Sequence, residues 1–202
     1  MHRSSYIHQK QKDKEELIAR ALEVSLANKV RKMLGAADSP YIVSLMRLIE
    51  TQSKATIASW CMDYAEAHIL PIFEKYCPGD KRPRNAITAA RDWFEGRKKL
   101  PEVKSIILNE CHAAARELDA NPAAQAAARA CGQASACFHT PTHSLGLAFY
   151  GAAAIAYDRV GTRENQEVYD QIAAEECAKM EAALCAVAVA NEPNPAKINW
   201  NC

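Results

Sequence analysis

The sequence has little of what β-structure requires. Only 7 of its 202 residues are glycine and 7% are aromatic, whereas strands favour aromatic and β-branched residues and the turns between them favour glycine. Alanine and straight-chain helix formers predominate instead. These observations argue against a β-sandwich or barrel and favour an all-α fold.

Long apolar runs and a strong net charge are also lacking. The most apolar stretch, from Leu145 to Tyr157, is 13 residues long, and a membrane span needs about 20. The formal net charge is +1, so the overall charge does not call for a nucleic acid or an anionic membrane as partner. We therefore expect neither a membrane nor a nucleic-acid partner.

Eight cysteines are present, but nothing else suggests a secreted disulfide framework. The first residues, MHRSSYIHQKQKDKEEL, contain no apolar signal-peptide core, so we expect a cytoplasmic protein with reduced thiols. No C-x-x-C motif occurs. We interpret the six cysteines that stand among alanine and other apolar residues as small core residues, and expect no cofactor: Cys61, Cys111, Cys131, Cys137, Cys177 and Cys185.

Prolines, glycines and capping residues divide the chain into helices. The pattern predicts a single compact all-α domain of about eight helices with short connections. We expect Pro71 to kink its helix or to begin a new one. The expected helices span residues 13–34, 40–49, 54–76, 82–96, 100–118, 122–138, 141–160 and 162–190.

Small side chains dominate the buried-looking positions of the helices after Cys111. Because alanine and glycine let helix backbones approach closely, these helices are expected to form an alanine-rich inner layer. We further expect residues 1–52 to be an N-terminal helical extension packed on a core of residues 53–190, and residues 191–202 to be a tail. The triplet Ala-Ala-Arg ends at Arg91, Arg116 and Arg129, without a regular period.

The stretch ACFHTPTHSLG places His139 and His143 four residues apart around Pro141. Two zinc ligands at this spacing need an unbroken helix, but Pro141 should lie in the first turn of a new helix with Thr140 as its cap. We interpret the stretch as a helix junction that directs two imidazoles into one polar pocket. A metal site completed by His112 is kept as the alternative.

Two further groups of polar residues could carry function. Arg82 and Arg84 flank Pro83 at a helix start, where anions are preferred, so each predicts an acidic partner: Asp80, the acidic C-terminal helix or another protein. Arg91 follows on nearly the same stripe. His112 and Arg116 lie four residues apart on one helix face, either as a polar stripe or as a general base with its neighbour.

Motifs of the common enzyme classes are absent: G-x-S-x-G, the P-loop and G-x-G-x-x-G do not occur. Three other segments, read in order, resemble the putative immunity protein family of bacterial polymorphic toxin systems over about residues 58–157. They are WCMDYAEAHILPIFEKYCPGDKRPRNAITAARDWFEG, ECHAAARE and AAQAAARACGQASACFHTPTHSLGLAFYGAAA. The family has an arginine before the leucine-proline segment, where this chain has His68.

The resemblance implies an all-helical, cytoplasmic, non-enzymatic protein that neutralises a cognate toxin or effector by binding it. The polar positions within the matching segments form a shared pocket or a satisfied network: Asp80, Arg82, Arg84, Arg91, Trp93, His112, Arg116, His139, His143 and Tyr150. Two alternatives stay open. One is a small metal- or ligand-binding enzyme using His112, His139 and His143, and the other is a homodimer formed through the helix around Ile42 to Ile49.

Overall fold

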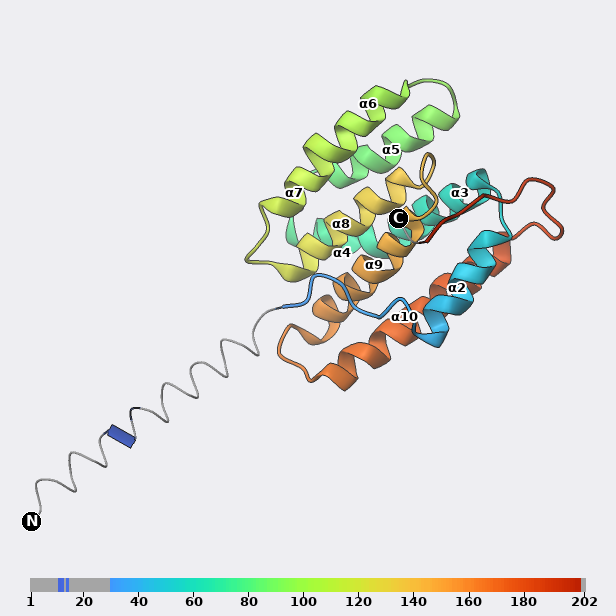
Figure 1. Ribbon diagram of the computed structural model, residues 1–202. Helices are drawn as coiled ribbons and strands as arrows, with labels where there is room; N and C mark the ends of the chain where they lie inside the picture. Colours follow the sequence, from blue (N-terminus) through green and yellow to red (C-terminus); the bar gives the residue numbers. More distant parts are fainter. Residues whose placement is uncertain (1–10, 13, 15–29, 201–202) are drawn as a thin grey trace, which may run out of the picture. The chain divides into compact units, whose positions relative to one another are not determined.

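The computed structural model describes residues 11, 12, 14 and 30–200, and it divides the chain into two units, residues 1–31 and 32–202 (Figure 1). Most of the helix predicted over residues 13–34 lies outside the described residues. Its described end, residues 30–34, is irregular, so the predicted helix does not reach Leu34. The second unit contains the helical core.

The described part of this unit consists of seven helices and contains no strand, which confirms the all-α fold class. Two of the helices are composite, because a π-helical segment joins two α-helical segments. In chain order, the elements are α2 (Pro40–Glu50), α3 (Lys54–Tyr64), η1 (Ala65–Ile69), α4 (Leu70–Tyr76), α5 (Arg82–Phe94), α6 (Leu100–Ser105), η2 (Ile106–Cys111), α7 (His112–Arg116), α8 (Pro122–Ala136), α9 (His143–Val160) and α10 (Gln166–Val187).

Pro71 lies in the first turn of a new α-helical segment, α4, which is one of the two outcomes expected for it. The chain accommodates it through η1, where the N–H of Leu70 donates to the carbonyl of Ala65, five residues back. Pro71 then occupies the first turn of α4, where the lack of an N–H costs little intrahelical hydrogen bonding. The second π segment, η2, ends in the same way, with the N–H of His112 donating to the carbonyl of Ile107.

The start of α9 differs from the prediction. Thr140 is not its cap and Pro141 is not in its first turn; the helix begins at His143 after Thr142. The reason is local hydrogen bonding: the Pro141 carbonyl accepts bonds from the Ser144 hydroxyl at 2.6 Å and from the Ser144 N–H at 3.0 Å. Pro141 therefore belongs to the turn that precedes the helix.

Helix α8 forms the alanine-rich inner layer together with α9. It packs against α9 most extensively and also contacts α3, α4, α5 and α7 (Figure 1). Of its 15 residues, all are buried except Pro122, Arg129 and Gln133. Alanine and glycine permit this close packing because they leave little side chain between the backbones.

Five of the six cysteines expected in the core are buried with free thiols. Cys185 is the exception, because it is exposed near the end of α10. The Sγ atoms of Cys61 and Cys137 lie 3.3 Å apart, and burial, followed by the Cys137 thiol, raises the pKa of Cys61 well above its ordinary value. The Cys61 thiol is therefore packed and protonated.

Helix α2 lies in the same unit as the core and packs against α10. Ile42, Leu45 and Ile49 are buried there, so the apolar face that was expected to form a homodimer is covered within the chain. The described part of the tail contacts the α2–α3 junction, where the N–H of Ala196 donates to the Gln52 carbonyl at 2.8 Å. In the described part of the chain, no helix combines the length and apolar character needed to cross a membrane.

Candidate functional site

The predicted arginines of α5 are paired with carboxylates of this chain. Arg82 contacts Asp80 at 2.7 Å and Glu117 at 2.6 Å, and its guanidinium lowers the pKa of Asp80 below the ordinary value. Arg84 forms two hydrogen bonds to Glu74, at 2.8 and 2.9 Å. Asp80, rather than the C-terminal helix, is thus the nearby partner of Arg82.

Arg91 completes this set of ion pairs. It contacts Asp63 and Glu66, each at 2.8 Å. All three arginines therefore form ion pairs with carboxylates of the same chain. Exposed ion pairs of this kind contribute little to stability. They are poorly suited to receive an acidic partner, because a partner would first have to displace an internal carboxylate.

Trp93 belongs to a different group, a row of rings at the junction of α8 and α9. Its ring lies 4.6 Å from Phe138, which lies 4.9 Å from His139, which lies 5.8 Å from His143 (centroid distances). The junction thus brings three of the predicted residues together through Phe138. Ring contacts at these distances and tilts hold side chains in a fixed orientation.

The two imidazoles of the junction are not hydrogen-bonded to a common group. Nδ1 of His139 is 2.6 Å from the Thr140 hydroxyl, and Nδ1 of His143 is 2.7 Å from Oε1 of Gln133. Burial lowers the pKa of both histidines, and Lys104 adds to the effect on His139. Both imidazoles are therefore neutral at pH 7 and have separate hydrogen-bond partners.

The metal alternative has no geometric support in the described residues. Within them, no three histidine, cysteine, aspartate or glutamate side chains are placed so that they could hold a metal ion. His112, His139 and His143 all belong to the described part. These three histidines consequently do not form the ligand set that a zinc site requires.

The His112 ring packs against α8 at Gly132, where only a glycine leaves enough room for the ring. A Cβ atom on Gly132 would be 2.6 Å from Cε1 of His112, closer than real contacts. The imidazole is half-buried, and its pKa is lowered by burial, then by Arg129, Arg116 and His143. Every charge that affects His112 is therefore positive.

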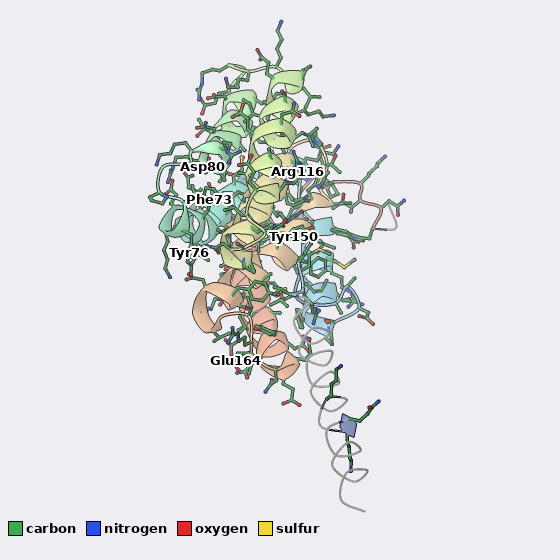
Figure 2. All side chains as sticks on the ribbon, turned by 90° about the vertical axis from the view of Figure 1, so that its left-hand side faces the viewer. Phe73, Tyr76, Asp80, Arg116, Tyr150 and Glu164 are labelled. Atoms are coloured by element: carbon green, nitrogen blue, oxygen red, sulfur yellow. The ribbon has the colours of Figure 1, made fainter. Side chains whose placement is uncertain are left out.

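His112, Arg116, Arg129, His143 and Tyr150 together form what we call the cationic cluster. Arg129 lies over the Tyr150 ring, with its Cζ atom 5.8 Å from the centroid. Figure 2 views the side of the molecule that carries α6 and α7, where Arg116 and Tyr150 are labelled. Three helices supply the cluster: α7 the first two residues, α8 Arg129, and α9 the last two.

Arg129 was not among the predicted site residues. It is one of the three residues of α8 that are not buried, and its Nε atom is buried without a hydrogen-bond partner. The Ala-Ala-Arg triplets were the only signal in the sequence. Two of the three bring their arginines, Arg116 and Arg129, to the cationic cluster, whereas Arg91 joins the ion pairs described above.

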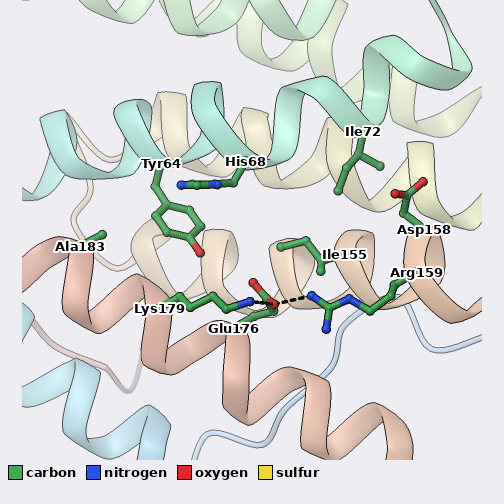
Figure 3. Close-up of a pocket in the computed structure, with 9 residues that line it drawn as sticks. All are labelled: Tyr64, His68, Ile72, Ile155, Asp158, Arg159, Glu176, Lys179 and Ala183. Atoms are coloured by element: carbon green, nitrogen blue, oxygen red, sulfur yellow. Dashed lines mark hydrogen bonds and ion pairs between the residues drawn. The ribbon is translucent and has the colours of Figure 1, made fainter.

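A separate pocket of about 620 Å³ lies between the α3–η1–α4 helix and helices α9 and α10 (Figure 3). Its charged centre is Glu176, which is only 3% exposed. Glu176 contacts Arg159 at 2.8 Å and Lys179 at 2.6 Å. Sequence reasoning missed this pocket, since its walls come from helices far apart in the chain.

Besides Asp158 of α9, the pocket has two further polar side chains, which come from α3 and η1. The Tyr64 and His68 rings lie 4.5 Å apart, and the Tyr64 hydroxyl points toward Glu176 and Lys179 (Figure 3). Burial, followed by the charge of Glu176, raises the pKa of Tyr64. Because Glu176 is already neutralised by two cations, the pocket differs from the cationic cluster, whose arginines form no ion pair with a carboxylate among the described residues.

A family model described as Imm-5 like putative immunity protein matches residues 47–183. The chain belongs to this family. The match confirms the resemblance and extends it on both sides, so that it includes the ion pairs, the cationic cluster and the lining of the Glu176 pocket. No curated protein and no solved structure matches the chain.

Proposed function

We propose that this immunity-family protein neutralises a cognate toxin or effector by binding it, as part of a bacterial polymorphic toxin system in the cytoplasm. Membership of the immunity family carries the proposal. An immunity-protein family suggests a protein as the partner. Binding alone is enough for such a role, because a toxin is inactive when its active site or its target surface is covered.

The side of the molecule formed by α7, α8 and α9 supports this proposal. It combines half-buried aromatic and polar side chains, and these types are enriched in the energetic centres of protein interfaces. The row of rings at the α8–α9 junction and the cationic cluster are linked through His143. We place the toxin-binding surface here rather than on the ion-paired face of α5.

Co-expression tests the proposal directly. The gene neighbouring this one would be expressed in a bacterial host with and without the immunity protein, and growth would be measured. We expect growth to stop with the neighbour alone and to recover with both, and the two proteins to co-purify. Continued arrest together with the absence of a complex would refute the proposal.

The same assay separates binding from the enzymatic alternative. An inhibitor that acts by binding must be present in at least the same amount as the toxin, whereas an enzyme that inactivates the toxin or its product acts repeatedly. Growth would therefore be measured while the expression of the immunity protein is lowered stepwise. Recovery that disappears once the immunity protein falls below the toxin supports binding, and full recovery far below that ratio supports an enzyme.

A further inference from the structure

Within the described residues, the cationic cluster contains a buried side-chain donor that has no acceptor, the Nε–H of Arg129. Arg82, Arg84, Arg91 and Arg159 each contact a carboxylate of this chain. Arg129, by contrast, has the Tyr150 ring as its contact, and its Nε–H has no acceptor. A buried donor without an acceptor destabilises the protein, so an arriving acceptor would recover free energy.

The surroundings of Arg129 are unusual for an arginine whose Nε–H has no acceptor. Its neighbours along α8 are buried alanines, and a charged side chain in such surroundings normally has a partner of opposite charge. The side chain as a whole is half-buried. Other atoms of the side chain are thus accessible, although the Nε atom is covered.

The surroundings of Arg129 hold its side chain, and the described acidic residue closest in sequence to the cluster is bonded elsewhere. The Tyr150 ring covers the guanidinium, and a guanidinium stacked in this way keeps its edge available for hydrogen bonds. His112 is fixed against Gly132 and His143 is fixed by Gln133. Glu117, the acidic residue next to Arg116, is bonded to Arg82 instead.

We propose that the cationic cluster is the binding site for a carboxylate of the protein partner, an aspartate or glutamate side chain or the chain terminus, with Arg129 as its main ligand. A planar carboxylate matches the edge of a guanidinium with two parallel hydrogen bonds. A small rotation of the Arg129 side chain brings its Nε–H to the bound oxygen, and rotamer changes of this kind are common on binding. The inference rests on the proposed function, because it names the chemistry of the partner.

A carboxylate fits the cluster better than a phosphate does. Burial lowers the pKa of the three nearby histidines, and neighbouring cations add to this effect at His112 and His139. The histidines are therefore neutral, and Arg116 and Arg129 supply the positive charge. Arg116 is exposed and its charge is screened by water. One well-placed guanidinium balances the single charge of a carboxylate, whereas a dianionic phosphate calls for several buried cations.

The first experiment uses the full chain without a toxin. The arginine Nε–H groups would be observed by ¹⁵N NMR during titration with sodium acetate, with sodium chloride at equal ionic strength as reference. We expect a saturable shift of the Arg129 signal, and none for Arg47, an exposed arginine on α2. Absence of a saturable shift, or a response to inorganic phosphate alone, would overturn the proposal.

The second experiment uses the toxin and compares Arg129→Gln with the matched control Arg47→Gln. Glutamine keeps much of the side-chain length and removes the charge, and circular dichroism would verify that both variants fold. We expect Arg129→Gln to weaken toxin binding by about 30-fold or more and Arg47→Gln to leave it unchanged. Equal binding by wild type and Arg129→Gln would overturn the carboxylate site while leaving the proposed function intact. If wild type itself binds no toxin, the proposed function fails, and the acetate titration still decides the site.

Discussion

Replacing Gly132 by alanine tests the contact that positions His112. The new Cβ would be 2.6 Å from Cε1, 3.0 Å from Nδ1 and 3.1 Å from Nε2 of the imidazole. Because the closest of these distances is shorter than real contacts, the ring must move. Overpacking of this kind costs about 1–3 kcal/mol, and alanine returns about 1 kcal/mol through its higher helix propensity. The free energy of unfolding should therefore fall by about 0–2 kcal/mol.

A double-mutant cycle isolates the clash from the propensity effect. In a His112→Ala background there is no ring to displace, so Gly132→Ala should stabilise the protein by about 1 kcal/mol. The difference between the two backgrounds, about 1–3 kcal/mol, is the interaction energy of the pair. Urea unfolding followed by circular dichroism at neutral pH measures all four proteins. If the alanine has the same effect in both backgrounds, the packing of His112 on α8 described here is incorrect.

Three further predictions concern charge, pH and thiols. Glu176→Gln should lower the free energy of unfolding by about 2 kcal/mol, because it removes charged hydrogen bonds from a buried carboxylate; a loss no larger than that of Glu175→Gln in urea unfolding would contradict this. His112, His139 and His143 have folded-state pKa values below the unfolded value of about 6.5. The unfolded state therefore binds more protons as the pH falls, and the melting temperature should decrease on acidification from about pH 7 to pH 5. A melting temperature that stays constant over this range would contradict the prediction. Under native conditions a maleimide should modify Cys185 and leave Cys61 and Cys137 intact until the protein unfolds, and peptide mass spectrometry would show early labelling of the buried pair if the prediction is wrong.

The predictable parts of the fold depend on interactions between residues close in sequence. Pro40, Pro83 and Pro122 each lie in the first turn of a helix, as predicted, because a proline there forfeits no intrahelical hydrogen bond. The alanine content likewise predicted the inner layer of α8 and α9, since small side chains permit close approach in any arrangement of helices. The order of the motifs was sufficient to predict the immunity family.

The candidate site could be predicted only in part. The sequence drew attention to His112, Arg116 and Tyr150, but Arg129 was passed over as one arginine in a repeated triplet. Its significance lies in its lack of an ion-pair partner among the residues that the structure describes. Sequence spacing cannot show this, because Glu117 follows Arg116 directly and yet bonds to Arg82.

Thus the sequence by itself determined the all-α class, most helix starts, the small-residue layer and the family, because each depends on local backbone preferences or on the order of residues. The tertiary structure alone decided which charges meet. It paired the arginines of α5 with carboxylates and placed Glu176 of α10 opposite Tyr64 of α3. Among the described residues, it left the Nε–H of Arg129 without an acceptor. Electrostatic partners are set by distances of a few ångströms between helices, and those distances follow from how the whole unit packs.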